Sequence, residues 1–450
     1  MRIHFIAIGG SAMHNLAIAL HKKGYQITGS DDVIFEPAKS RLDQYGLLPT
    51  EMGWYESRIN TTLDAVILGM HARVDNPELL KAQELGVKIY SYPEYIYEQS
   101  KSKQRVVIGG SHGKTTITSM ILHVLNFYQR DFDYLVGAQL AGFETMVKVT
   151  EEAPVMIIEG DEYLSSPIDR RPKFHLYKAN VAVISGIAWD HINVFPTYAD
   201  YTSQFDKFID TIEEGGTLIY CEADQDLNEI VLAAKAAINK IGYAIPNHII
   251  ENGITYLLPE KTALKIFGDH NLMNLNAAKL VCEQLDIHAA AFDQAIASFT
   301  GAAKRLEVIS ADELTNVYKD FAHSPSKLKA TIDAVKAQFT DRKLIACIEL
   351  HTFSSLNKDF LKEYSGAMDK ADEAIVFIDL KSFELKRMEP FSEQDVQEAF
   401  ANQKLKFFND AGRLKSYLLS LNYNHANLLM MSSGNYAGFD LPELAASLKR

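Results

Sequence analysis

The sequence predicts an α/β protein with three domains in series: a Rossmann-like amino-terminal domain, a central P-loop ATPase domain and a Rossmann-like carboxy-terminal domain. Three observations lead to this fold class. Apolar runs of strand length alternate with helical patterns, glycines follow the first strand, and a Gly-Lys-Thr turn joins a later strand to a helix. The 450 residues suffice for two or three domains. We place the domains at 1–103, 104–302 and 303–450.

The first domain opens with the strand and glycines of RIHFIAIGG. A helical stretch and a second strand, YQITGSDD, complete a βαβ unit, which DAVILGM and VKIYSY extend before the polar boundary EQSKSKQ at 98–104. In such a unit, backbone N–H groups after the first strand bind a pyrophosphate, and the second strand ends near a nucleoside hydroxyl. The positions concerned are Gly9, Gly10, Ser11, Ser30 and Asp31. On this evidence alone, an NAD-dependent dehydrogenase is an alternative.

The second domain begins with RVVIGGSHGKTTITSM, in which an apolar strand runs through a glycine turn into a helix. The standard phosphate-binding loop is G-x-x-x-x-G-K-[ST], but the residue five positions before Gly113 is Ile108. The match is therefore either accidental or a shorter variant of the loop. In a phosphate loop the lysine binds the β and γ phosphates and the following hydroxyl binds magnesium. The loop residues are Gly110, Ser111, His112, Gly113, Lys114, Thr115 and Thr116.

A second strand of this domain, VMIIEGDE at 155–162, delivers three carboxylates to its carboxyl end, where a nucleotidase needs a magnesium ligand. The alternative is a plain acidic loop after a strand. His191 in WDH follows another buried strand and either binds a metal or caps the turn. Thr115, Glu159 and His191 form the candidate metal set.

The third domain starts near GAAKRLEV and contains the strands RKLIACIEL, EAIVFIDL and NLLMMSSG between helical segments. This alternation is again typical of a parallel α/β sheet.

Charge and composition exclude several classes of protein. The formal net charge of −13 disfavours a nucleic-acid or membrane-surface binder, although an anionic small substrate is still allowed. Three isolated cysteines fit a reducing compartment and argue against a zinc site. Without a signal peptide or an 18-residue apolar run, the sequence leads us to expect a cytoplasmic protein.

Five motifs in order, GGSHGKTT, EGDEY, WDH, GDHNLMN and KRLE, resemble those of the Mur ligases. These ATP-dependent enzymes join amino acids or peptides to the nucleotide-linked sugar precursor of peptidoglycan. The family uses the short loop G-[TS]-x-G-K-T-T, so Ile108 does not count against the match. The resemblance covers nearly the whole chain. It implies ATP and Mg²⁺ as cofactors, UDP-N-acetylmuramate as a substrate held by the amino-terminal domain, and a monomer or weak homodimer.

The resemblance also assigns residues to roles. It implies catalytic roles for Lys114, Glu159 and His191, and it places Asn271, Asn274, Arg305 and Asp320 around the ATP nucleotide. The alternative for HNLMNLNAA is a plain helix start with asparagine caps. A catalytically inactive sugar-nucleotide-binding regulator would need a broken loop or a missing metal carboxylate, and both are present in the sequence.

Within the family, segments such as EYLSSPIDRRPKF and MSSGNYAG resemble the murein peptide ligases of peptidoglycan recycling, which attach L-alanyl-γ-D-glutamyl-meso-diaminopimelate. Accordingly, Arg170, Arg171 and Lys173 are expected to bind carboxylates of the incoming peptide. Two departures, Ala7 and Ala12 in the glycine fingerprint and His351 in ELHTFSS, differ from that pattern, and His351 resembles the L-alanine-adding ligases. UDP-N-acetylmuramate L-alanine ligase is therefore the alternative function.

Overall fold

In the computed structural model of the chain, the described residues are 1–140, 142–189, 194–302 and 305–448. They form two compact units, one made of Met1–Ile245 with Met273–Ile296 and the other of Pro246–Leu272 with Ala297–Arg450. The segment Pro246–Leu272, which the sequence analysis places in the middle domain, thus groups with the carboxy-terminal part. The parallel α/β sheets confirm the predicted fold class.

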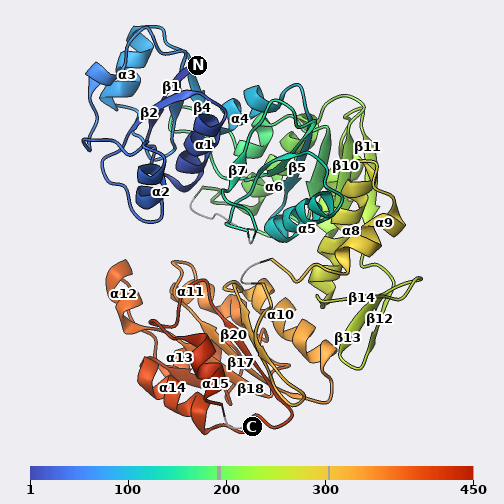
Figure 1. The fold of residues 1–450 in the computed structure, drawn as a ribbon. Coiled ribbons are helices and arrows are strands. Elements are labelled where there is room, and N and C mark those ends of the chain that lie inside the picture. Colours follow the sequence, from blue (N-terminus) through green and yellow to red (C-terminus); the bar gives the residue numbers. More distant parts are fainter. Residues whose placement is uncertain (141, 190–193, 303–304, 449–450) are drawn as a thin grey trace. The chain divides into compact units, whose positions relative to one another are not determined.

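The first unit contains a four-stranded parallel sheet near the amino terminus, with the order β2-β1-β3-β4 (Figure 1). Its strands are β1 (Arg2–Ile6), β2 (Gln26–Ser30), β3 (Ala65–Leu68) and β4 (Ile89–Ser91). Its helices are α1 (Ser11–Lys22), α2 (Ala38–Gln44), α3 (Pro77–Glu84) and α4 (Tyr92–Ser100), with the short 3-10 helix η1 (Glu56–Arg58). β3 is buried and apolar throughout and β1 is buried from Ile3 to Ile6, as expected for parallel strands with both faces covered.

The same unit contains a seven-stranded sheet with the order β11-β10-β9-β5-β8-β6-β7. All its strand pairs are parallel except β6 with β7. The strands are β5 (Gln104–Gly109), β6 (Asp133–Leu135), β7 (Val147–Lys148), β8 (Val155–Glu159), β9 (Val181–Ile184), β10 (Thr217–Cys221) and β11 (Asn239–Tyr243). The helices are α5 (Lys114–Phe127), η2 (Lys173–Leu176), α6 (Tyr198–Asp210), α7 (Gln225–Ala233), α8 (Asp269–Glu283) and α9 (Ala289–Ile296). The start of α8, up to Leu272, groups with the second unit. Since β5 and β8 are neighbours in parallel register, their carboxyl ends lie side by side.

The second unit has a six-stranded sheet with the order β15-β16-β20-β17-β18-β19, in which only β15 runs antiparallel among the described strands (Figure 1). Its strands are β15 (Glu307–Ala311), β16 (Asn316–Asp320), β17 (Lys343–Glu349), β18 (Glu373–Phe377), β19 (Lys406–Phe408) and β20 (Ala426–Met431). The helices are α10 (Pro325–Gln338), α11 (Lys358–Leu361), η3 (Lys362–Tyr364), α12 (Leu380–Lys386), α13 (Glu393–Ala399), α14 (Ala411–Ser420) and α15 (Leu441–Ala446). A separate antiparallel sheet consists of β12 (His248–Glu251), β13 (Ile254–Leu257) and β14 (Thr262–Leu264).

The three cysteines are buried and unpaired: Cys221 ends β10, Cys282 lies on α8 and Cys347 lies on β17. Burial raises the pKa of each thiol above its ordinary value. Each therefore packs as a small apolar residue of the core.

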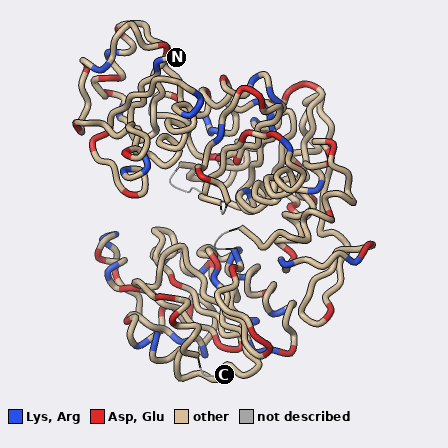
Figure 2. The backbone as a smooth tube through the Cα atoms, viewed as in Figure 1, with Lys and Arg blue, Asp and Glu red and all other residues tan. Residues whose placement is uncertain are grey.

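Lysines and arginines are mixed with acidic residues along the backbone (Figure 2), and the acidic residues outnumber them, 58 to 45. In the part of the chain that the structure describes, no helix combines the length and apolar character needed to cross a bilayer.

Candidate active site

The glycine turn between β5 and α5 forms a cradle of backbone groups. Gly110 and Gly113 adopt positive φ angles of 117° and 80°. A Cβ atom at Gly110 would lie 2.4 Å from the Ser185 hydroxyl, and one at Gly113 would lie 2.2 Å from the side-chain oxygen of Asn274. Both positions therefore require glycine. The Ser111 N–H donates to the carbonyl of Gly186 at 2.9 Å, which ties the loop to the end of β9.

Lys114, the first residue of α5, is held by oxygen atoms on two sides. Its ammonium donates to the Gly110 carbonyl at 2.6 Å and to the Glu162 carboxylate at 3.0 and 3.2 Å. Glu162 has no solvent exposure and also accepts a hydrogen bond from the Tyr201 hydroxyl at 3.2 Å. Burial disfavours the charged lysine, but the nearby carboxylates, Glu162 first, outweigh it and raise the Lys114 pKa. The ammonium stays charged and must exchange a partner to reach a phosphate.

Glu159 ends β8 beside the phosphate loop. Its carboxylate accepts hydrogen bonds from the Thr115 hydroxyl at 2.8 Å and from the Gly137 N–H at 2.8 Å. Burial raises the Glu159 pKa, so this carboxyl group lacks a full set of compensating charges. A hydroxyl and a carboxylate in contact are hard oxygen donors of the kind that Mg²⁺ prefers, and they fit the ion. When bound, Mg²⁺ would neutralise phosphate charge there.

The third predicted ligand, His191, lies outside the described residues. Within those residues, no group of three histidine, cysteine or acidic side chains is arranged to hold a metal ion by itself. This agrees with a Mg²⁺ ion that takes most of its ligands from nucleotide phosphates and water.

The residues predicted to surround the ATP nucleotide are divided between the units. Asn274 packs against Gly113 in the first unit. Asn271 belongs to the second unit, where its side-chain amide donates to the Phe267 carbonyl at 2.9 Å.

In the second unit, Asp320 ends β16 and accepts hydrogen bonds from the N–H groups of Leu306 and Ala322, at 2.8 and 2.7 Å. Arg305 stacks over the ring of Phe321 at 5.0 Å. Two backbone bonds thus already engage Asp320, while the Arg305 guanidinium lies next to an aromatic face.

His270, which the sequence analysis did not single out, interacts electrostatically with Asp320 and Arg305. Its pKa is lowered by burial, with opposing effects from Asp320 and Asp269 and a further lowering by Arg305. Its buried Nδ1 has no hydrogen-bond partner among the described residues. The signal was its position directly before Asn271 in GDHNLMN.

At the amino-terminal glycines, the Gly9 N–H donates to Asp31 at 2.7 Å. Burial raises the Asp31 pKa to about 6, although this N–H opposes the shift. Ser11 is exposed at the start of α1, where it can meet a ligand, and Gly10 precedes it. Ser30 is fully buried and its hydroxyl donates to Glu78, so this side chain stabilises the end of β2; its contact with a nucleoside stays a prediction.

The basic run after β8 forms an antiparallel hairpin. Lys173 pairs with Asp161 at 2.6 Å, and Arg171 pairs with Asp169 at 2.7 Å and with Glu94 at 3.7 Å. Arg170 is exposed and has no hydrogen bond or ion pair within the described residues. Of the three cations predicted to bind the peptide, Arg170 is the one that forms no ion pair with another described residue.

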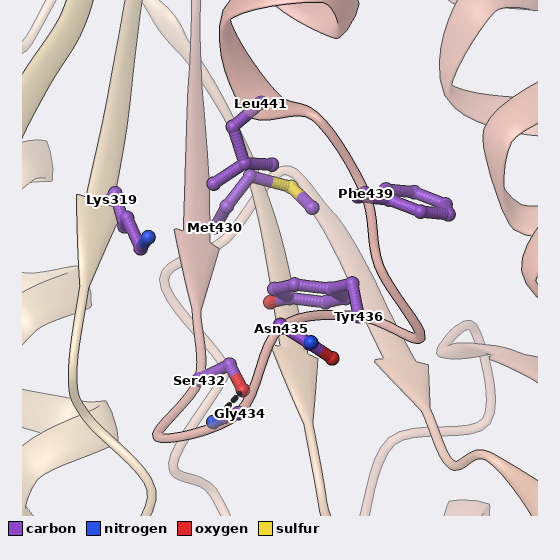
Figure 3. Close-up of a pocket in the computed structure, with 8 residues that line it drawn as sticks. All are labelled: Lys319, Met430, Ser432, Gly434, Asn435, Tyr436, Phe439 and Leu441. Carbon is purple, nitrogen blue, oxygen red and sulfur yellow. Dashed lines mark hydrogen bonds between the residues drawn. The ribbon is translucent and has the colours of Figure 1, made fainter. Parts of the chain in front are cut away.

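The carboxyl ends of β17 and β20 carry a further polar cluster. Glu349 is buried and accepts from the Tyr436 N–H at 2.9 Å and from the Ser432 hydroxyl, which also accepts from the Gly434 N–H (Figure 3). The adjacent cavity measures about 40 Å³, which is water-sized. This cluster therefore fixes the loop after β20 rather than holding a substrate.

A glycine turn, a lysine at a helix start and a half-buried strand-end carboxylate together define a P-loop nucleotide-dependent enzyme. Comparison with known proteins agrees. The Mur ligase family catalytic domain model matches residues 2–104, the Mur ligase middle domain model 108–282 and the glutamate ligase domain model 304–434. The chain is 31% identical over 390 residues to the UDP-N-acetylmuramate--L-alanine ligase of Caldicellulosiruptor bescii, covering 83% of this chain and 82% of that one.

Solved structures share the fold. A UDP-N-acetylmuramate-alanine ligase from Thermotoga maritima aligns with a TM-score of 0.67 at 20% identity, covering 97% of this chain and 96% of that one. A murein peptide ligase from Psychrobacter arcticus aligns with a TM-score of 0.62 at 21% identity, covering 99% and 98%. The chain belongs to the Mur ligase family, and it is an ATP-dependent ligase that forms amide C–N bonds.

Proposed function

We propose that this ligase uses ATP to activate the carboxylate of UDP-N-acetylmuramate and then joins it to the amino group of an amino acid or peptide. The observation that carries the proposal is the meeting of Lys114, Thr115 and Glu159 at the adjacent ends of β5 and β8. A lysine, a hydroxyl and a carboxylate at one sheet edge suit a phosphoryl transfer that needs charge neutralisation.

The chemistry follows from a poor leaving group. A carboxylate oxygen is not displaced by an amine in water, so the sugar carboxylate first takes the γ-phosphoryl group of ATP and ADP is released. The amine then attacks the carbonyl carbon of the acyl phosphate, and inorganic phosphate departs as the amide bond forms. Both reactants of the first step are anions, which Lys114 and the N–H groups of the loop would bring together.

Magnesium, held by Thr115 and Glu159 with His191 as a further candidate ligand, would supply additional positive charge at the phosphates. Gly9, Gly10 and Ser11 would bind the UDP pyrophosphate, with Asp31 beside them. Asn271, Asn274, Arg305 and Asp320 remain our candidates for the ATP nucleotide. We further propose that the enzyme works in the cytoplasm, where ATP is available, as a monomer or weak homodimer.

L-alanine is the first candidate for the incoming amine. Its support is the identity of 31% to an L-alanine-adding ligase across most of both chains. His351 points the same way, because it resembles the pattern of those ligases. On this reading the enzyme acts in peptidoglycan biosynthesis. The NAD-dependent dehydrogenase, which the first domain alone allows, is not supported by the family match.

The tripeptide L-alanyl-γ-D-glutamyl-meso-diaminopimelate is the second candidate. Its support is the hairpin of DRRPKF, which presents the uncommitted cation Arg170 after the metal strand β8. Several carboxylates on one acceptor would match several cations, whereas free alanine has a single carboxylate. On this reading the enzyme recycles peptidoglycan fragments.

One experiment tests the function and separates the two acceptors. Purified protein with ATP, Mg²⁺ and UDP-N-acetylmuramate is given L-alanine, the dipeptide L-alanyl-D-glutamate or the tripeptide, and phosphate release is measured. Phosphate release that depends on both the sugar nucleotide and an acceptor supports the proposal. A higher kcat/KM for L-alanine assigns biosynthesis, and a higher value for the tripeptide assigns recycling. No sugar-dependent release with any acceptor would overturn the proposed function.

A further inference from the structure

An open cavity lies between the hairpin that follows β8 and helix α6. Its volume is about 560 Å³, within the range of small-molecule binding sites. Leu164, Ile168 and Phe195 form part of an apolar wall, and the polar lining includes Arg170 and Lys207. Lys207 lies on α6, far from Arg170 in sequence, so two separate elements supply the charged lining.

The cavity walls are held in place by hydrogen bonds. Across the hairpin, the Lys173 N–H donates to the Tyr163 carbonyl at 2.9 Å and the Ser165 N–H donates to the Arg171 carbonyl at 3.0 Å. On the other side, His175 Nε2 contacts the Gln204 carbonyl of α6 at 2.7 Å. The hairpin and α6 therefore present a preformed site rather than two independent surfaces.

The positive charge of the cavity comes from Arg170 and Lys207. Asp169 largely neutralises Arg171, because two side-chain nitrogens of the arginine contact its carboxylate. Burial first, then Lys207 and Arg171, lower the His175 pKa, so this imidazole is neutral at pH 7. Arg170 and Lys207 are exposed and form no ion pair within the described part of the chain. Two uncompensated cations thus face a space with an apolar wall.

We propose that this cavity binds the carboxylate end of an acidic peptide, with Arg170 and Lys207 as the carboxylate-binding residues. The inference rests on the proposed ligase function and on its second candidate acceptor, the tripeptide, which would be the incoming peptide. An anion such as free phosphate would not use the apolar wall, and free alanine would fill only a small part of the volume. A peptide with an aliphatic chain and more than one carboxylate uses both features.

The position of the cavity along α6 fits this role. Tyr201, six residues before Lys207, contacts Glu162, the partner of Lys114. Six helical residues span about 9 Å. An extended tripeptide spans about 10 Å. A peptide of this length therefore matches the axial distance along α6 from Lys207 to Tyr201, the helix residue that contacts Glu162.

A binding experiment tests the cavity without catalysis. The chain has two tryptophans, and the indole N–H of Trp189 donates to the carbonyl of Phe195 in the cavity wall at 3.1 Å. In a Trp54→Phe background, the fluorescence of Trp189 is titrated with L-alanyl-γ-D-glutamyl-meso-diaminopimelate. We expect a saturable change that weakens at least 10-fold in Arg170→Ala/Lys207→Ala, because each charge-assisted contact is lost. Trialanine amide, which has no carboxylate, should give no saturable change.

Kinetics with matched controls complete the test. Arg170→Ala/Lys207→Ala should raise the KM for the tripeptide about 10-fold or more, with kcat and the KM values for ATP and UDP-N-acetylmuramate unchanged. Replacing Arg170 with lysine instead of alanine should keep most of the affinity for the tripeptide. Arg73→Ala, which removes an arginine of the first unit that is 83% exposed, should change nothing. An unaltered melting temperature shows that the variants are folded.

The outcomes separate this inference from the proposed function. The cavity assignment is overturned if the double variant binds the tripeptide as tightly as the parent protein does, or if the KM for the tripeptide is unchanged. Neither result would contradict the proposed ligase function. Saturation of the Trp189 signal by UDP-N-acetylmuramate in competition with the peptide also overturns it, since the cavity would then hold the sugar nucleotide. If the protein binds the tripeptide through Arg170 and Lys207 but ligates no acceptor, the proposed function is overturned while the peptide-binding site is supported.

Discussion

The ammonium of Lys114 is bound to the buried carboxylate of Glu162 at 3.0 Å, although it is the lysine of a phosphate loop. A nucleotide phosphate must compete with Glu162 for the same ammonium. The pair therefore keeps the lysine charged and in place before the nucleotide arrives.

Replacing Lys114 with alanine should abolish ligation while UDP-N-acetylmuramate binding survives. The cation stabilises charge at the phosphoryl group, a loss that typically costs on the order of 10²–10³ in turnover. For the sugar nucleotide we propose the amino-terminal glycines instead. Phosphate release and calorimetric titration measure the two properties, and a folded variant that loses both equally contradicts separate sites.

Glu162→Gln should destabilise the fold by about 3 kcal/mol at pH 7, because it leaves the ammonium of Lys114, whose side chain is only 18% exposed, without its buried counter-ion. The raised Lys114 pKa gives a stabilisation that is fully present below the unfolded value of 10.5 and is lost as pH rises through the folded pKa. Urea unfolding measures the difference. Glu213→Gln is the control, since Glu213 pairs with Arg105 at 3.2 Å while 41% exposed and should cost under about 1 kcal/mol. Equal losses of unfolding free energy in the two variants would show that the Lys114–Glu162 pair stabilises the fold no more than an exposed ion pair does.

Glu159→Ala and His191→Ala should each raise the Mg²⁺ concentration needed for half-maximal turnover and lower the maximal rate. Each change removes one candidate ligand while the phosphate loop remains. Turnover measured across a Mg²⁺ series checks both variants. If His191→Ala has an unchanged Mg²⁺ dependence, that histidine only caps its turn.

Gly113→Ala should impair ATP binding and stability more than Gly24→Ala. Both glycines have positive φ, but only at Gly113 does the new Cβ meet another atom, the Asn274 oxygen. Strain alone costs roughly 1–2 kcal/mol. Thermal melting and nucleotide titration compare the variants. Adding Asn274→Ala to Gly113→Ala should recover part of the lost melting temperature, and no recovery would show that the clash is not the cause of the lost stability.

The phosphate loop and the strand-end carboxylate could be predicted from sequence because both depend on local pattern. Apolar runs fix β5 and β8, and parallel neighbours bring their carboxyl ends together. The role of Ser30 could not be predicted, because its burial against Glu78 depends on a residue 48 positions away. The same limit applies to Arg171 and Lys173, whose acidic partners are visible only once the hairpin has formed.

The positive charge of the cavity could not be predicted from the sequence either. The local sequence QFDKF does not show which of Asp206 and Lys207 would line a cavity. Only the packing orientation of α6 makes Lys207 part of the cavity beside the hairpin. Likewise, the grouping of Pro246–Leu272 with the second unit follows from tertiary packing rather than from composition.

The buried cysteines make the protein a convenient object for site-directed labelling. Thiols whose pKa is raised by burial react slowly with maleimides and methanethiosulfonates, so the natural cysteines need not be removed. A cysteine introduced at an exposed position of each unit, as in Arg73→Cys with Arg413→Cys, would be modified first. Paired spin labels at these two positions would then give the distance between the units directly, with and without nucleotide.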